Sequence, residues 1–183
     1  MQVSRVSMLV VAVALAVPIA SAAQAPPVPK PGPEHELLKM DAGVWDATVE
    51  VSEPGGQKMT SKGVETSTIG CGGKCLIVDF KGDLMPGVPF LGHGLTTWDP
   101  RKKKYVGSWT DSMASGLAVG ETTWDPAAKR MTGWMEGPGM DGQISKTRSV
   151  VDYKDGGRVF TAYATGPDGK EMQVLKITYA RRK

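Results

Sequence analysis

The residues able to carry out chemistry are few and widely spaced in this chain of 183 residues. Nucleophilic catalysis needs a base beside a serine or a cysteine, and the only histidines are His35 and His93, neither with an acid at a useful local spacing. Zinc and haem are also poorly supported, because no histidine-rich segment and no paired cysteine and histidine spacing occurs. We therefore predict no catalytic residue, no metal site and no cofactor, and it stays open whether the protein is an enzyme.

Two cysteines, Cys71 and Cys75, flank a loop of sequence Gly-Gly-Lys. Opposed positions across such a hairpin loop can reach the Cα separation of a disulfide, and an oxidising compartment favours the bond. A redox-active pair is the alternative, but thioredoxin-type reactivity uses a different spacing and a helix N-terminus. We predict an intrachain disulfide.

Asp111-Ser112-Met113 is the most distinctive loop motif. Asp111 can accept backbone hydrogen bonds within a turn, or it can contact a ligand if its side of the strand faces an interior. Glu65, Glu121 and Arg148 lie within predicted strands, and any of them that points inward must be paired. The neighbouring residues alternate too poorly to settle their direction. Arg148 is either a polar anchor inside an apolar pocket or an outward surface charge.

Turns and strands must position these residues. The sequence Thr-Thr-Trp-Asp-Pro occurs at residues 96–100 and again at 122–126, and Asp followed by Pro is typical of a type I turn. Pro33 and the acids after it favour a helix over residues 33–40. From Val44 the apolar residues recur at every second position, which indicates a half-buried strand. Similar runs predict ten strands in all, over about 44–52, 57–69, 75–82, 89–98, 104–111, 115–124, 130–137, 143–154, 157–165 and 170–180.

The connections between these runs are too short for parallel crossovers, so the topology is an up-and-down meander. Closure into a barrel removes both exposed edges, and we prefer it to a sandwich for that reason. The predicted fold is all-β: a closed antiparallel up-and-down barrel of about ten strands with a short N-terminal capping helix. The helix and the Trp-Asp-Pro corners then share one rim.

The opposite rim carries the apolar loop 84–90 together with Met113 and Met140. Flexible apolar side chains at a barrel entrance suit a portal for a small apolar or amphipathic molecule. Met85, Phe90 and Met113 would line the entrance, and Asp111 or Arg148 would orient the ligand. Alternatively the loop seals a barrel filled by its own side chains, which would act through its surface as an envelope interaction or structural protein.

The N-terminal segment has the features of an export signal. Arg5 precedes an apolar run from Met8 to Val17, and small residues follow at 20–23. The run is too short to remain as a membrane anchor. We predict a signal peptide over residues 1–25, a Pro-rich tether over 26–33 and one barrel domain over 34–183, in a periplasmic or secreted protein.

Without Arg5 the chain has 21 basic and 19 acidic residues, since the full sequence has 22 and 19. A balance so close to neutral argues against a nucleic-acid partner, which requires a concentrated basic face. The oligomeric state is not indicated by the sequence.

Gly43-Val44-Trp45, after the short helix, resembles the Gly-x-Trp signature of lipocalins and related calycin barrels. In that superfamily the tryptophan closes the barrel base against an arginine near the end of the last strand. The resemblance implies this role for Trp45 with Arg181 or Arg182, and a guanidinium over an indole is a favourable contact.

A longer stretch resembles the bacterial domain-of-unknown-function 1579 family. The likeness runs from Gly32-Pro33-Glu34-His35-Glu36 through Trp109-Thr110-Asp111-Ser112-Met113 to Ile177-Thr178-Tyr179. It implies a small lipocalin-like barrel and brings no established reaction. Cys71 and Cys75 depart from the family pattern, in which ordinary apolar residues flank the Gly-Gly turn.

Overall fold

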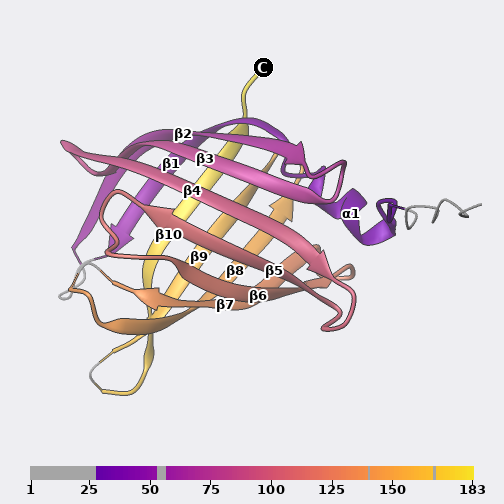
Figure 1. Ribbon diagram of the computed structural model, residues 1–183. Coiled ribbons are helices and arrows are strands. Elements are labelled where there is room, and N and C mark those ends of the chain that lie inside the picture. Colours follow the sequence, from indigo (N-terminus) through magenta and orange to yellow (C-terminus); the bar gives the residue numbers. More distant parts are fainter. Residues whose placement is uncertain (1–27, 53–56, 140, 167) are drawn as a thin grey trace, which may run out of the picture.

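The computed structural model describes residues 28–52, 57–139, 141–166 and 168–183, and within them the chain forms a closed antiparallel barrel (Figure 1). Each strand pairs with its neighbours in the chain, and β10 pairs with β1 to close the barrel. This order confirms the predicted up-and-down topology. The strands are β1 (Gly43–Ser52), β2 (Lys58–Gly70), β3 (Cys75–Met85), β4 (Val88–Asp99), β5 (Lys104–Asp111), β6 (Ala118–Asp125), β7 (Arg130–Pro138), β8 (Ile144–Lys154), β9 (Gly157–Thr165) and β10 (Glu171–Arg181).

The strand boundaries differ most from those predicted at the β3–β4 connection and at the start of β6. The predicted loop 84–90 is mostly paired strand, because β3 and β4 continue to the cross-strand pair Met85 and Val88. Gly87 makes this tight turn possible with φ of +77°. Strand β6 begins at Ala118 instead of residue 115, since backbone amides after β5 bind the Asp111 carboxylate rather than a neighbouring strand.

The predicted signal peptide, residues 1–25, lies outside the described residues. Within the predicted tether, residues 28–32 form neither helix nor strand. Helix α1 (Pro33–Leu38) begins with proline at its first turn, as predicted, and ends two residues earlier than expected. The His35 ring is used locally, because its Nδ1 accepts a hydrogen bond from the backbone N–H of Gly32 at 2.9 Å.

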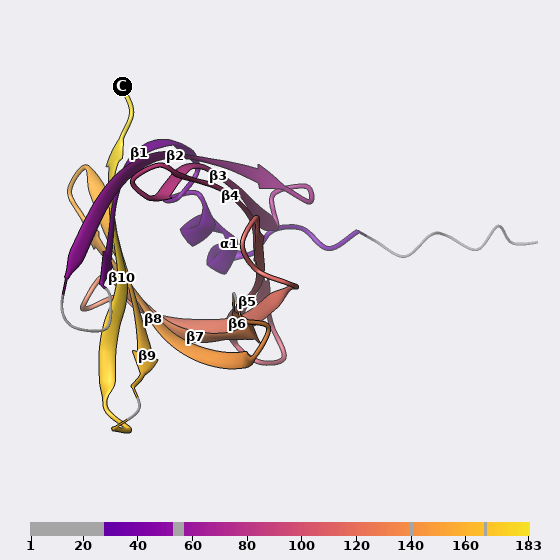
Figure 2. The same ribbon diagram turned by 90° about the vertical axis from the view of Figure 1, so that its left-hand side faces the viewer.

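Helix α1 lies across one end of the barrel. Figure 2 looks along the barrel from the other end and shows the helix behind the ring of strands. Its Leu38 side chain is 2% exposed and packs in a cluster with Leu76, Tyr105 and Met131. The Tyr105 hydroxyl donates to the backbone oxygen of Glu34 at 2.8 Å, which attaches the helix to β5. We call this the closed end.

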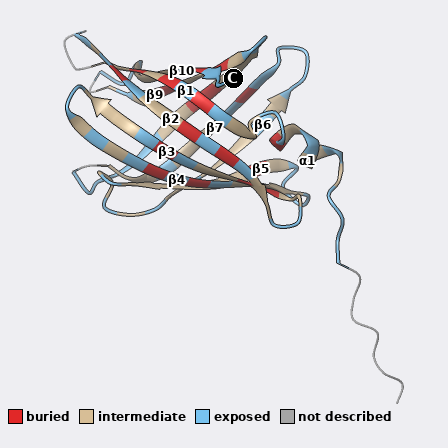
Figure 3. Cartoon of the chain, turned by 90° about the horizontal axis from the view of Figure 1, so that it is seen from above, coloured by how far each residue is buried: buried red, intermediate tan, exposed pale blue. Residues whose placement is uncertain are grey.

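The alternation expected for β1 is present. Trp45, Ala47 and Val49 are buried and point inward, while the residues between them are more exposed. Figure 3 shows the buried positions as bands that alternate with exposed ones along β1 and β2. The inward residues of β1 pack with Phe80 and Tyr179 in a second core cluster.

Glycine permits two close approaches on the inner wall. A Cβ at Gly92 would overlap the Trp109 ring, and a Cβ at Gly133 would overlap the backbone oxygen of Glu121. The first glycine makes room for an inward aromatic side chain. The second allows β6 and β7 to curve tightly, which is a common use of glycine in barrels.

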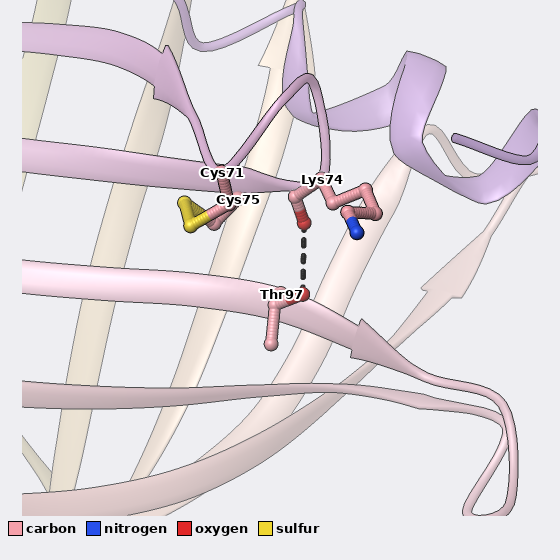
Figure 4. Close-up of a disulfide and its surroundings, with 4 residues drawn as sticks. All are labelled: Cys71, Lys74, Cys75 and Thr97. Carbon is pink, nitrogen blue, oxygen red and sulfur yellow. Dashed lines mark hydrogen bonds between the residues drawn. A yellow bond between two sulfur atoms is a disulfide. The ribbon is translucent and has the colours of Figure 1, made fainter. Parts of the chain in front are cut away.

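The predicted disulfide between Cys71 and Cys75 is present at the turn between β2 and β3 (Figure 4). The Cα atoms are 5.5 Å apart. Within the turn, Lys74 offers its backbone oxygen to the Thr97 hydroxyl on β4 at 2.8 Å. The bond therefore lies in a turn that is also tied to the next strand.

Candidate functional site

A buried ion-paired network occupies the interior near the closed end. Arg158, on β9, is 6% exposed, and its guanidinium carbon lies 4.4 Å from the Trp45 ring centroid and 4.3 Å from that of Tyr179. Its Nη2 donates to Glu65 Oε1 at 2.5 Å, and its Nε lies 3.2 Å from Asp41 Oδ1. The guanidinium is thus held by two aromatic rings and two carboxylates.

Neighbouring side chains orient both carboxylates. The Ser67 hydroxyl donates to Glu65 at 2.6 Å, and the Tyr153 hydroxyl donates to Asp41 Oδ2 at 2.9 Å. The Trp45 indole N–H donates to the backbone oxygen of Asp41 at 2.8 Å. We call these residues the floor network: Asp41, Glu65, Ser67, Tyr153 and Arg158. They lie at the α1 end of the barrel interior, which we take as its base.

Burial is the largest single influence on the pKa values of this network. It raises the pKa of Asp41, although the Arg158 charge opposes this. Burial also opposes the charge of Arg158, but the Asp41 and Glu65 carboxylates outweigh it, so the pKa of Arg158 is raised. Burial raises the pKa of Tyr153 and of Tyr179 well above 10, so both remain protonated at neutral pH.

The expected pairing of Trp45 with a C-terminal arginine is present. Arg181 lies 4.2 Å from the Trp45 ring centroid and donates to two backbone oxygens of the connection between α1 and β1, at 2.9 and 3.1 Å. Arg182 does not share this role, because it points outward and pairs with Asp46. The sequence also gave no indication of Arg158, which provides the buried guanidinium beside Trp45.

Toward the end opposite α1 the interior changes character, and we call this part the open half. Val49 is 2% exposed, but Val51, the next inward residue of β1, is half-buried. Other apolar side chains pack against the same core cluster and are likewise half-buried: Phe90, Trp109, Phe160, Leu175 and Ile177. The inner wall of the open half is therefore largely apolar and partly exposed. Half-buried apolar side chains also occur at the closed end, where Trp98, Trp124 and Tyr153 pack against the Leu38 cluster.

The predicted entrance residues lie at or near the rim of the open half. Met85 ends β3, Met113 follows β5, and both are half-buried. Phe90 points inward and meets Phe80 edge to face, with ring centroids 5.9 Å apart. The structure brings these three residues to one end of the barrel. Met140 lies outside the described residues.

Asp111 makes the turn contacts that its motif suggested. Its Oδ1 accepts hydrogen bonds from the backbone N–H groups of Met113 and Ala114 at 2.9 and 2.8 Å. Its Oδ2 accepts the indole N–H of Trp109 at 2.9 Å. Both carboxylate oxygens are engaged, so Asp111 positions the rim turn and the Trp109 ring.

Of the two alternatives for Arg148, the structure shows the outward surface charge and not the inward anchor. Arg148 is on the outer face of β8, where it pairs with Glu171 at 2.8 Å and stacks on Tyr163 at 4.1 Å. Its inward neighbours by alternation are Thr147 and Ser149. Glu121 also faces outward and pairs with two lysines near the β4–β5 turn. Of the three charges whose direction was open, only Glu65 points inward, and its partner is Arg158.

The outer wall carries two grooves, of about 590 and 650 Å³, over β1 to β5. Their polar groups are largely paired with one another. Arg182 binds Asp46 in the first, and His93 Nδ1 lies 2.8 Å from Asp79 Oδ1 in the second. His93 is therefore an exposed strand residue.

Within the part of the chain that the structure describes, no group of three or more His, Cys, Asp or Glu side chains could hold a metal ion. No helix in that part is long and apolar enough to cross a membrane.

Comparison with known proteins gives a family and a fold. A family model described as "Protein of unknown function (DUF1579)" matches residues 30–181. No curated protein matches. Similar solved structures include Rv2717c from M. tuberculosis, with TM-score 0.64, 10% identity and coverage of 83% of this chain and 99% of that chain. Another is the S-type phycobiliprotein lyase CPES from Guillardia theta, with TM-score 0.54, 11% identity and coverage of 82% and 93%. At such low identity these structures support the fold alone.

Proposed function

This chain belongs to the DUF1579 family, whose function is unknown, and we propose that it binds a small apolar or amphipathic molecule in the open half of its barrel. The observation that carries the proposal is the apolar inner wall at the end of the barrel opposite α1. Inward apolar side chains there, among them Phe90, Phe160 and Ile177, retain exposed surface, and α1 lies across the other end (Figure 2). Exposed apolar surface on a concave wall favours an apolar ligand, which gains about 0.8 kcal/mol per buried methylene.

The rim suits entry of such a ligand. Met85 and Met113 have flexible side chains that can adapt to different shapes, and Phe90 offers an aromatic edge beside them. Asp111 supports this rim by holding its turn and the Trp109 ring. Its role in the proposal is to position these groups, since its own oxygens are occupied.

Two further points are compatible with the proposal. A structurally similar barrel is described as a phycobiliprotein lyase, which is compatible with a small-molecule site in this architecture. The Cys71–Cys75 disulfide suits an oxidising compartment, and we propose a periplasmic or secreted location on that basis together with the N-terminal signal features.

Titration with N-phenyl-1-naphthylamine, an uncharged fluorescent probe of apolar sites, tests the proposal. The wild-type protein should bind it with saturable enhancement of fluorescence. Replacing the inward, half-buried Ala164 with Phe should weaken binding at least tenfold by filling the open half. Ala180→Phe adds the same group to an exposed, outward position of β10 and should leave binding unchanged.

The same pair of variants tests the alternative of a barrel filled by its own side chains. If the interior is already full, Ala164→Phe overpacks it and should cost about 1–3 kcal/mol of stability. Lack of saturable probe binding together with that destabilisation would contradict the proposal. An unchanged melting temperature with weakened probe binding supports it.

A further inference from the structure

Two buried polar atoms of the floor network have no hydrogen-bond partner among the described residues: Asp41 Oδ1 and Arg158 Nη1. Their side chains are in direct contact, because Arg158 Nε lies 3.2 Å from the same Asp41 oxygen. One acceptor and one donor without a hydrogen bond therefore occur together in this network, although the two residues form an ion pair. Buried polar atoms without partners are rare and costly, so this pair requires an explanation.

The pair lies directly beneath the open half. On β9 the inward residue next to Arg158 is Phe160, and on β10 the inward residue next to Tyr179 is Ile177. Arg158 and Tyr179 are buried, whereas Phe160 and Ile177 are half-buried. On these two strands the interior changes from buried to half-buried between successive inward positions, although Val49 opposite Ile177 and Ala162 beyond Phe160 are buried. A molecule in the open half would approach the network from the side of Phe160 and Ile177.

The charges around the pair restrict what can satisfy it. A carboxylate or phosphate would accept from Arg158 but would lie beside the carboxylates of Asp41 and Glu65. An ammonium group would be attracted to Asp41 but repelled by the guanidinium. An uncharged hydroxyl group can accept one hydrogen bond and donate another without adding charge to a buried site.

We infer that the ligand of this barrel is an uncharged amphiphile whose hydroxyl group accepts a hydrogen bond from Arg158 Nη1 and donates one to Asp41 Oδ1. The inference rests on the proposed function and names the ligand class for the same site. The apolar part of the ligand would lie against Phe160 and Ile177, and its hydroxyl would complete the floor network.

Displacement of bound N-phenyl-1-naphthylamine by three compounds that each carry a twelve-carbon chain tests the inference. Dodecan-1-ol donates and accepts, dodecyl methyl ether only accepts, and dodecanoate at pH 8 carries a negative charge. Dodecan-1-ol should displace the probe at a concentration roughly tenfold lower than either of the others, as expected for one hydrogen bond to a charged group. Equal or better displacement by the ether or by dodecanoate overturns the inference alone. Failure of the probe to bind overturns the proposed function and the inference with it.

Asp41→Asn tests the inference through ligand preference, which a nonspecific loss of packing would not change. It removes one negative charge while retaining an oxygen for Tyr153, so the preference for dodecan-1-ol over dodecanoate should fall at least tenfold. Asp46→Asn is the matched control, because it changes net charge equally at an exposed residue on the outer face. The control should keep the wild-type preference, and equal behaviour of the two variants overturns the inference.

A crystal structure of the wild-type protein with dodecan-1-ol keeps the inference testable even if Asp41→Asn does not fold. The alcohol oxygen should lie within about 3.2 Å of both Asp41 Oδ1 and Arg158 Nη1. A water molecule at that position, with the alcohol bound elsewhere, overturns the inference.

Discussion

Replacing Arg158 with Met should be among the most destabilising substitutions in the protein. The change retains a long side chain between the Trp45 and Tyr179 rings but removes the only guanidinium that pairs with Glu65 and Asp41 in the floor network. Breaking a buried ion pair in this way leaves uncompensated buried charge and costs about 3–5 kcal/mol. The side chains of Arg158 and Glu65 are 6% and 7% exposed, so solvent offers little compensation.

Urea unfolding followed by tryptophan fluorescence measures this loss. With a slope of about 2 kcal/mol per molar urea, the midpoint should fall by roughly 1.5–2.5 M. Arg130→Met is the matched control, since Arg130 pairs with Asp152 on the outer wall with 48% of its side chain exposed. Exposed pairs contribute little to stability, so the control should barely move the midpoint.

A second substitution separates charge from packing. Adding Glu65→Gln to Arg158→Met removes one of the unpaired charges and should recover part of the lost stability, whereas Glu65→Gln alone should destabilise. If Arg158→Met costs no more than Arg130→Met, the floor network is not the buried ion-paired structure described above. If Glu65→Gln gives no recovery, the loss comes from packing around the rings.

Three other predictions follow from the same contacts. Burial holds the pKa of Asp41 in the folded protein above its unfolded value of about 3.9. The protonated Asp41 side chain therefore stabilises the fold at low pH, and this contribution is lost as the pH rises through the folded pKa. The stability of Asp41→Asn relative to wild type should accordingly increase from pH 4 to pH 7 in urea titrations. Native protein should show no free thiol, and reduction of Cys71–Cys75 should cost about 2 kcal/mol for so short a loop. Asp111→Ala should cost about 1–3 kcal/mol in the same unfolding assay through three lost hydrogen bonds, and should alter the Trp109 emission.

The buried network explains why the base of the barrel needs more than the tryptophan and arginine of the signature. Arg181 lies over Trp45 and ties the connection after α1, but it is exposed. Arg158 contacts the same ring from within the core and brings two carboxylates with it. The base is therefore held by a surface arginine and a buried one, and the buried one faces the interior where a ligand would bind.

Some features could be predicted because they depend on residues close together in the chain. The Trp-Asp-Pro turns, the short connections and the two-residue period are local properties, and they led to the closed meander that β1 and β10 complete. The Cys71–Cys75 bond is local in the same sense, because the turn itself brings the two residues together. The hydrogen bonds from the backbone of Met113 and Ala114 to the Asp111 carboxylate are local for the same reason.

The direction of charged side chains could not be predicted in this way. Arg148 and Arg158 both lie in strands without a clear alternation of polar and apolar residues. Arg148 nevertheless lies on the outer wall and Arg158 in the core. The sequence left the direction of Arg148 open and did not point to Arg158, because no local signal distinguishes the two arginines. Register decides the matter: Arg158 is opposite Tyr153 and Tyr179, on the inner face.

The sequence by itself determined the strand order, the turns, the helix position and the disulfide, because each results from steric and hydrogen-bonding preferences of a few adjacent residues. Only the tertiary structure decided that Asp41, Glu65 and Arg158, which are far apart in the chain, meet in one buried network. Such a meeting depends on how the closed barrel sets the register of distant strands and on the cost of burying unpaired charge, and neither can be read from a short segment.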